Sequence, residues 1–216
     1  NSTNPDIIVF TGDIVSHKTS ELAPFIKSLK KLKAKDGIFS VLGNHDYGDY
    51  AKWANSKEKE NNLKELIAIN QDSLGWRLLN NENCYIHKGR DSIAVIGVEN
   101  WGEPPFKQYG NLKKAMPNNT DCFKILLTHN PKHWEAEVLG KTDINITFSG
   151  HTHAMQSMIE LGNKIYSPSS LRYKYWGRLY SVSNQYINVN IGVGMVGIPA
   201  RFGAKPEISL ITLKTK

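Results

Sequence analysis

Side chains that bind metal ions stand at four places in the chain, each directly after an apolar run. They are Asp13, then Asn44 with His45 and Asp46, then His129, and last His151 with His153. Imidazole nitrogens combined with carboxylate and amide oxygens suit Mn, Fe, Zn, Ni or Co rather than Ca. A carboxylate can bridge two ions about 3.5–4 Å apart, which is the geometry of two-metal hydrolysis. Chance easily produces one such place, but four in succession indicate a shared site for divalent metal ions.

Each motif taken alone also has an ordinary interpretation. Gly12-Asp13 is a common strand-to-turn dipeptide, His129 suits a core or turn histidine, and residues 150–153 suit a solvated turn. The run Gly43-Asn44-His45-Asp46 is rarer, because it places three site-forming side chains in a row. A glycine stands directly before Asp13, Asn44 and His151, where a sharp turn needs a permissive residue.

Three further histidines lack such neighbours. They are His17, His87 and His133. We interpret them as surface or helix-start residues.

Four apolar runs lead into the ligand-type residues, and each is typical of a buried strand. They are residues 6–10, 38–42, 123–127 and 144–148. In open α/β sheets, ligands bind outside the carboxyl ends of the strands. We therefore expect the four loops to converge.

The remaining elements follow from the period of the apolar residues. Helical spacing predicts helices between Ser20, as N-cap, and Gly37, then over 62–74 and over 132–138. A period of two predicts strands over 76–79, 84–87, 92–98 and, last, 208–213. Residues 101–120 are rich in Gly, Pro, Asn and Lys, which predicts a long excursion that could cover a site.

Composition indicates one globular domain in these 216 residues. No run of about 18 apolar residues occurs, so the sequence predicts no transmembrane helix within them. The net charge of +7 favours anionic partners such as phosphate esters, anionic lipid or nucleic acid, or else a well-solvated surface.

The lysines of residues 27–35 are interpreted as a solvated helix face. Cys84 and Cys122 do not form a disulfide framework; we expect buried thiols, and a single bridge stays open.

The four ligand motifs together resemble the calcineurin-like metallophosphoesterase superfamily, over about residues 6–153. The segments 190–194, 197–202 and 206–208 are similar to the end of bacterial membrane-associated members of the YkuE/YaeI type. The resemblance implies an α/β fold with two facing β-sheets flanked by helices, an α/β/β/α sandwich. It implies one metallophosphoesterase domain over residues 1–216.

The resemblance also implies a set of metal ligands. Asp13 is similar to the carboxylate that bridges two divalent ions. Asn44, His129 and His151 resemble the other protein ligands of the second metal, and His153 resembles a ligand of the first.

Two neighbouring residues resemble the catalytic pair of the superfamily. His45 is similar to the histidine that contacts the phosphoryl group and protonates the leaving oxygen. Asp46 is similar to the residue that orients this imidazole, which would fix its tautomer and raise its basicity.

The sequence departs from the superfamily pattern at its start. An Asp-x-His block at the end of a strand opens the superfamily pattern, but only eleven residues precede Gly12 here, none of them His. We therefore expect an N-terminally incomplete domain that lacks this strand, binds at most one of two divalent ions well, and turns over slowly. Because relatives of the YkuE/YaeI type carry an N-terminal anchor or export signal, we expect a bacterial membrane-associated parent protein. A cytoplasmic protein is the alternative.

The expected reaction is hydrolysis of a phosphoester by a metal-bound hydroxide. The substrate class is a phosphodiester or a lipid-linked phosphate, with a membrane surface or lipid as a further partner. Two alternatives remain, namely an inactive scaffold that binds a partner protein and a nuclease-type phosphodiesterase. No nucleic-acid-binding motif is visible, so nucleic acid is not the expected partner. The aromatic and basic stretch 171–180 shapes a substrate groove, meets lipid, or forms an ordinary strand pair.

Overall fold

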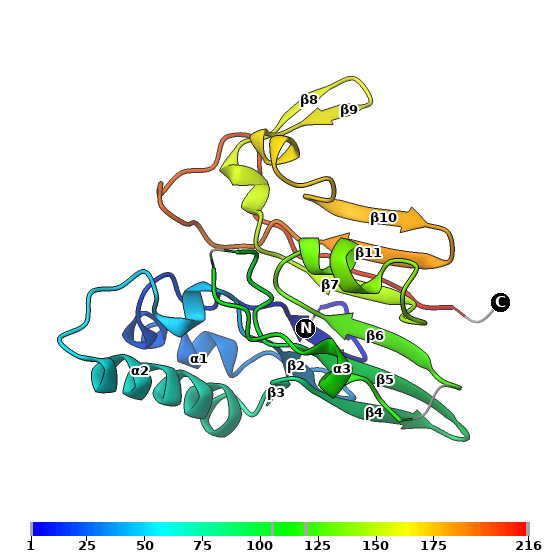
Figure 1. The fold of residues 1–216 in the computed structure, drawn as a ribbon, viewed down its shortest axis with the longest axis horizontal. Coiled ribbons are helices and arrows are strands. Elements are labelled where there is room, and N and C mark those ends of the chain that lie inside the picture. Colours follow the sequence, from blue (N-terminus) through cyan, green and yellow to red (C-terminus); the bar gives the residue numbers. More distant parts are fainter. Residues whose placement is uncertain (1, 105, 119–120, 215–216) are drawn as a thin grey trace.

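A small parallel sheet carries the first two ligand-bearing loops (Figure 1). The computed structural model describes residues 2–104, 106–118 and 121–214. Strands β1 (Ile8–Phe10), β2 (Ile38–Ser40) and β3 (Arg77–Leu78) are parallel and lie in that order. Ile8 lies opposite Ile38, so β1 and β2 end at the same edge of this sheet.

A six-stranded mixed sheet carries the other two loops. Its order is β10-β11-β7-β6-β5-β4. The strands are β4 (Glu82–Lys88), β5 (Asp91–Gly97), β6 (Phe123–Leu127), β7 (Ile146–Ser149), β10 (Arg178–Val182) and β11 (Gln185–Val189). The four central strands are parallel, and β4 and β10 pair antiparallel at its two edges. Since β6 and β7 are parallel neighbours, the loops that follow them also leave from one edge.

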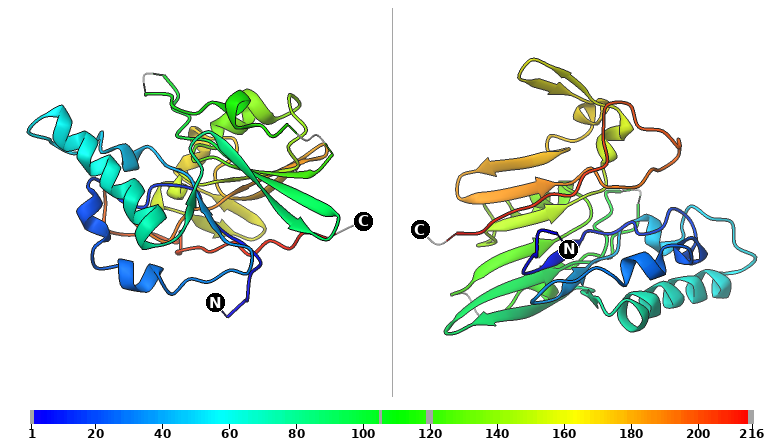
Figure 2. Two further views of the ribbon diagram at one scale, coloured as in Figure 1. Left: turned by 90° about the horizontal axis from the view of Figure 1, so that it is seen from below. Right: turned by 180° about the vertical axis from the view of Figure 1, so that it is seen from behind.

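Helices cover the outer faces of both sheets (Figures 1 and 2). They are α1 (Ile26–Leu29), α2 (Ser56–Ala68) and α3 (Leu112–Ala115). Short 3₁₀ turns cover Thr19–Leu22, His45–Tyr47, His153–Gln156 and Pro168–Leu171, and π-turns cover Ile69–Ser73 and Trp134–Val138. Asn55 caps α2 by accepting a hydrogen bond from the Glu58 N–H at 2.9 Å.

The two sheets face each other across an apolar core. Phe39 of the small sheet packs there with Val95 and Ile125 of the large sheet. A second cluster fills the space between the large sheet and Trp134, and a third lies under α2 around Leu66. Each fully buried side chain of this kind contributes about 1.5–3 kcal/mol relative to exposure. The layers confirm the predicted α/β class, with two facing sheets flanked by helices.

A smaller body, which we call the distal lobe, projects beyond the large sheet. It comprises residues 154–178 and 190–205 and contains the antiparallel hairpin of β8 (Ile159–Leu161) and β9 (Lys164–Tyr166). Figures 1 and 2 show the hairpin at the end of the lobe far from α1 and α2, whereas the loop 190–205 leaves it in another direction and extends over the side on which α1 and α2 lie. Among the described residues, no helix has both the length and the apolar character needed to cross a bilayer.

Three predicted elements differ from the structure. The helix expected between Ser20 and Gly37 is interrupted, since Pro24 has no N–H to donate, and only Thr19–Leu22 and Ile26–Leu29 are helical. The helix expected over 62–74 begins earlier, at Ser56. The strand expected over 208–213 is not paired with any strand among the described residues.

The other local expectations have mixed outcomes. The predicted excursion over 101–120 contains the short helix α3, and its residues 105, 119 and 120 lie outside the described residues. Among the described residues, neither Cys84 nor Cys122 is in a disulfide; Cys84 is buried, as expected, whereas Cys122 is only partly buried.

Candidate functional site

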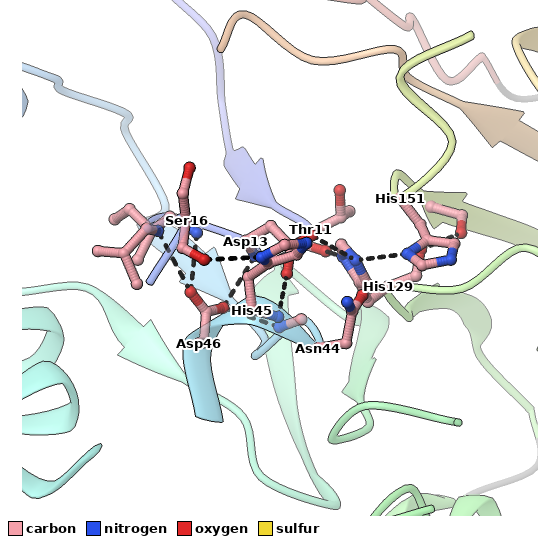
Figure 3. A network of polar contacts seen from close by, with 12 residues as sticks. Thr11, Asp13, Ser16, Asn44, His45, Asp46, His129 and His151 are labelled. Carbon is pink, nitrogen blue, oxygen red and sulfur yellow. Dashed lines mark hydrogen bonds and ion pairs between the residues drawn. The ribbon is translucent and has the colours of Figure 1, made fainter. Parts of the chain in front are cut away.

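Three of the predicted ligands meet at the ends of β1, β6 and β7 (Figure 3). The Oδ2 atom of Asp13 lies 3.0 Å from Nε2 of His129, and Nδ1 of His151 lies 3.1 Å from the same nitrogen. One potential ligand atom from each residue lies within 4.8 Å of the others. This spacing brings a carboxylate and two imidazoles to a common point.

Asp13 and His129 form a buried pair whose charges support each other. Burial is the largest influence on the pKa of Asp13 and acts to raise it, but His129, His45 and His151 together lower the pKa well below its usual range, so the carboxyl group stays ionised. Burial is the largest influence on the pKa of His129 and acts to lower it, but the Asp13 carboxylate, the Thr11 carbonyl and Asp46 together raise the pKa above its usual value. The Nδ1 atom of His129 contacts the Thr11 carbonyl oxygen at 2.7 Å, which turns Nε2 toward Asp13.

His151 and His153 are held in their neutral forms. Burial and the neighbouring His129 lower the pKa of His151 to about 3. Burial, followed by the charges of His129 and Arg201, lowers the pKa of His153 to about 4 despite the opposing carboxylate of Asp13. Neutral imidazole is the form that ligates a metal, so both rings are ready to do so at neutral pH.

Two buried polar atoms beside the cluster have no hydrogen-bond partner in the part of the chain that the structure describes. They are Oδ1 of Asn44 and Nδ1 of His153. Buried polar atoms are normally paired, and an unpaired one costs about 1–3 kcal/mol. The Nδ2 group of Asn44 donates to the Tyr50 hydroxyl at 2.9 Å, which leaves the oxygen side of the amide available to a cation. The residues present therefore fit a divalent metal ion of the types that accept O and N ligands.

Asp46 fixes the backbone of two ligand loops. Its carboxylate accepts hydrogen bonds from the N–H groups of Asp13 and Gly43, both at 2.8 Å, and of Ile14 at 2.9 Å. Burial and the nearby Asp13 charge raise the pKa of Asp46 to about 7, and the backbone donors oppose this rise. Asp46 thus joins the loop after β1 to the loop after β2.

The orienting contact of His45 differs from the predicted one. Its Nδ1 atom lies 2.7 Å from the carbonyl oxygen of Ser16, and its ring stacks on Tyr50 with centroids 4.3 Å apart. The predicted orienting role of Asp46 is therefore wrong, since Asp46 binds backbone N–H groups and the Ser16 carbonyl contacts the imidazole. This arrangement leaves Nε2 of His45 as the nitrogen that can meet a substrate.

Close backbone approach explains one glycine of the site. A Cβ atom on Gly43 would lie 2.2 Å from Oδ1 of Asp13 and 2.7 Å from Cε1 of His129. Any larger residue at this position would push the carboxylate and the imidazole apart. The same Oδ1 accepts a hydrogen bond from the His45 N–H at 2.8 Å, so Oδ2 is the oxygen of Asp13 that faces His129.

Sequence reasoning missed a tyrosine at the site. The hydroxyl of Tyr173, a buried residue, lies 2.9 Å from Nε2 of His151. With Nε2 held in this way, Nδ1 of His151 is the nitrogen that faces Asp13 and His129. Tyr173 lies within the stretch 171–180, and this contact agrees with the interpretation that part of the stretch shapes the site.

The backbone adopts left-handed conformations at the last two ligands and directly after them. His151, His153, Ala154, Met155 and Gln156 all have positive φ angles, between 45° and 69°. The Arg201 guanidinium closes the loop that follows β11 by donating to the carbonyl oxygens of Ile191 and Gly192, at 2.9 and 3.1 Å. A Cβ atom on Gly192 would lie 3.7 Å from Cε1 of His153, so the loop that follows β11 passes beside this ligand.

The three histidines set aside from the site lie elsewhere. His17 and His87 are exposed, as expected of surface residues. His133 stands directly before the turn Trp134–Val138, as expected of a helix start, but it is fully buried. Its Nδ1 atom lies 3.0 Å from Thr128 Oγ1 and its Nε2 atom lies 3.3 Å from Glu137.

Comparison with known proteins places this fold and these loops in one class. The family model for calcineurin-like phosphoesterases matches residues 1–155, which include the five predicted ligands. The chain belongs to this family. Membership supports metal-dependent phosphoester hydrolysis in general and a hydrolase as the kind of enzyme.

Curated relatives share most of this chain's sequence pattern. The chain is 32% identical over 222 residues to the Bacillus subtilis metallophosphoesterase YkuE, covering all of this chain and 70% of that protein. It is 29% identical over 228 residues to a bovine transmembrane protein with metallophosphoesterase domain, of which it spans only 47%. These relatives support the YkuE-type branch that the sequence predicted.

A solved structure supports the fold alone. The sulfate thiohydrolase SoxB of Thermus thermophilus has a TM-score of 0.51 and 14% identity, over 85% of this chain and 33% of that one.

Proposed function

We propose that this chain hydrolyses a phosphoester at the site formed by Asp13, Asn44, His129, His151 and His153. The observation that carries the proposal is the meeting of Asp13, His129 and His151, from three separate strand ends, within 4.8 Å. The unpaired oxygen of Asn44 supports it, because this buried atom has no hydrogen-bond partner among the described residues. We propose a phosphodiester or a lipid-linked phosphate as the substrate.

A bound divalent ion would polarise the phosphoryl group and lower the pKa of water. The chain's own residues position the reactants. The ionised Asp13 and the two neutral histidines His151 and His153 offer ligand atoms without first losing a proton. Asp46 keeps the loops of Asp13 and Gly43 at fixed separation, so the ligand atoms need little rearrangement.

His45 is the proposed general acid. The Ser16 carbonyl oxygen accepts a hydrogen bond from Nδ1–H of His45, which fixes the ring, and Nε2 can then donate a proton to the leaving oxygen. Stacking against Tyr50 restrains the plane of the ring. The proposal needs no charge on Asp46, since that residue acts on the backbone.

One cation is proposed to bind more tightly than a second. The described residues gather one group of three His, Cys, Asp or Glu side chains with ligand spacing. His153 lies outside that group. Manganese, iron, zinc, nickel and cobalt all suit this donor set.

The membrane-associated setting belongs to the same proposal. The bovine relative is named a transmembrane protein, and this supports a membrane-bound parent, with a cytoplasmic protein as the alternative. A lipid-linked phosphate would then lie at the surface where the enzyme is held.

Metal titration combined with a hydrolysis assay tests the proposed function. We expect calorimetry with Mn²⁺ to show one tight site, and Mn²⁺ to stimulate hydrolysis of bis-p-nitrophenyl phosphate. Asp13→Asn and His129→Gln should each lower metal affinity at least about 100-fold, because each removes a ligand. His87→Gln, at an exposed histidine, is the matched control and should change neither quantity.

Other outcomes would decide against the proposal. Metal binding without any phosphoester hydrolysis would favour the scaffold alternative, and preference for a DNA substrate would favour a nuclease. If Asp13→Asn and His87→Gln bind Mn²⁺ equally well, the site itself is misassigned.

A further inference from the structure

The distal lobe carries most of the excess positive charge of the chain. It contains six basic residues, namely Lys164, Arg172, Lys174, Arg178, Arg201 and Lys205, and one acidic residue, Glu160. Its surplus of +5 compares with +7 for the whole chain. The rest of the chain is thus nearly balanced, and the charge asymmetry is a property of this lobe.

Exposed apolar side chains concentrate in the same lobe. Half of the large apolar side chains that are exposed among the described residues lie in it. They include Ile159, Leu161, Leu171, Met195, Ile198 and Phe202. Scattered exposed apolar residues are normal, but a concentration beside positive charge marks an interaction surface.

The two segments of the lobe are joined, so they present these side chains as one body. The Gln156 amide donates to the Ile198 carbonyl at 2.8 Å and accepts from the Val196 N–H at 2.6 Å. The Phe202 N–H donates to the Gln156 carbonyl at 2.7 Å, and the Met158 N–H donates to the Phe202 carbonyl at 2.8 Å. These bonds join the loop 190–205 to residues 156 and 158, which lead into the hairpin β8–β9.

We infer that the distal lobe docks on the surface of a lipid bilayer that contains anionic lipids. Apolar side chains enter the region between headgroups and acyl chains, while Lys and Arg contact the anionic headgroups. Nucleic acid would use the positive charge but would leave Ile159, Leu161 and Ile198 in water. The charge and the apolar exposure together therefore fit a membrane surface better than a polyanion.

This inference concerns a surface of the chain itself and does not depend on catalysis. It also has a spatial consequence, because His153 directly precedes the lobe, and a Cβ atom on Gly192 of the lobe would lie 3.7 Å from Cε1 of His153 and 3.8 Å from Nη2 of Arg201. Docking through the lobe would hold the candidate metal site next to the headgroup layer. An anchor elsewhere in a longer protein would add to this contact but is not needed for it.

Vesicle co-sedimentation in EDTA tests the docking surface without turnover. We expect the chain to bind vesicles of phosphatidylcholine with about 30 mol% phosphatidylglycerol about tenfold more tightly than phosphatidylcholine alone. Ile159→Ser combined with Leu161→Ser should weaken this binding about tenfold.

The control pair is Ile208→Ser with Leu210→Ser, in the C-terminal segment outside the lobe. Those side chains are 87% and 66% exposed, against 59% and 65% for Ile159 and Leu161. The control pair should bind like the unaltered chain.

A charge series tests the electrostatic half of the inference. Lys164→Gln and Lys205→Gln should each weaken binding to the anionic vesicles about fivefold. Lys27→Gln and Lys30→Gln remove equal charge beside α1, outside the lobe, and should have little effect. Circular dichroism should show that all these variants keep the fold, since the altered side chains lie at the surface.

Three results would overturn the inference. The first is equal binding to vesicles with and without phosphatidylglycerol. The second is an equal loss of binding in the Ile159/Leu161 pair and in the Ile208/Leu210 control. The third is self-association in solution that Ile159→Ser with Leu161→Ser abolishes, together with no vesicle binding; the lobe would then be an interface between two copies of the chain.

Discussion

Two neighbouring regions of this molecule are built in opposite ways. The ligand cradle, which comprises loops 11–16, 43–46, 128–130 and 150–153, is buried or half-buried, and most of its polar side chains bind one another or the backbone. The distal lobe begins at the next residue, yet it is basic and rich in exposed apolar side chains. The contrast suggests a division of labour, in which the cradle holds ligands in place and the lobe meets a partner.

The two regions differ in the partners that their side chains find within the protein. In the cradle, the Asp46 carboxylate, the Thr11 carbonyl and the Ser16 carbonyl supply the partners that hold the reactive groups. In the lobe, the side chains of Gln156 and Arg201 donate hydrogen bonds to backbone carbonyl groups, but many apolar side chains are exposed. A region whose polar groups are internally paired keeps its shape, and a region with unpaired apolar surface gains free energy from contact.

Removing Asp46 should have the largest effect on this contrast. We expect Asp46→Ala to lower the free energy of unfolding by about 3–5 kcal/mol, because it leaves several buried N–H groups without an acceptor. Asp46→Asn keeps one acceptor oxygen and should lose less. Urea unfolding of the metal-free chain measures both, and metal affinity should fall as well. A loss below about 1 kcal/mol for Asp46→Ala would show that the cradle is not held in this way.

The pH dependence of stability should report the neutral state of His151. Its pKa is about 3 in the folded chain, below the ordinary value of 6.5, so the unfolded chain binds more protons between these values. Stability from this residue is therefore present above pH 6.5 and is lost as the pH falls toward 3. Between pH 7 and pH 5 the expected loss is about 2 kcal/mol.

A variant isolates that contribution from the other titrating groups. His151→Gln should reduce the change in unfolding free energy between pH 7 and pH 5 by this amount, measured with EDTA present. His87→Gln, at an exposed site in β4, should leave the change as it is. An unaltered pH dependence in His151→Gln would mean that the ring is not buried in its neutral form.

Tyr173 links the two regions, and its removal should have the smallest effect. Tyr173→Phe keeps the packing of the ring but removes the hydroxyl that contacts Nε2 of His151. We expect about tenfold weaker metal binding, equivalent to about 1.4 kcal/mol, with little change in stability. Calorimetry with Mn²⁺ measures it, and Tyr166→Phe, at an exposed position of β9, is the control. Equal Mn²⁺ affinities of Tyr173→Phe and Tyr166→Phe would show that the Tyr173 hydroxyl of the lobe does not contribute to metal binding in the cradle.

Much of the ligand cradle could be predicted from the sequence, because its signals are local. Each apolar run that ends in a ligand residue corresponds to a strand, and parallel neighbours bring the loops to a common edge. The family pattern added the order of the motifs. Where the predictions were wrong, a single residue acted over a distance or removed a bond. Pro24 interrupts the expected first helix, and Asp46 binds backbone groups more than 30 residues away.

The contacts that orient the imidazoles could not be predicted in the same way. The oxygens that contact His129 and His45 belong to the backbone of Thr11 and Ser16, and any residue type would supply them. Tyr173 is a side chain, but its meeting with His151 depends on the course of the lobe between them. Amino-acid composition also cannot predict that the apolar side chains of the lobe are exposed, because the same number of apolar residues could have formed a buried core.

The contact between His129 and Thr11 has a consequence for how the protein comes into being. These two residues are 118 positions apart, so the imidazole acquires its orientation only when the two ends of a long stretch have met. During synthesis from the N-terminus, Asp13 is made long before His129, the residue with which it forms the site. Affinity for metal should therefore arise late, once both sheets have closed on each other, and a nascent or truncated chain should pass through the cell's metal pool without capturing an ion.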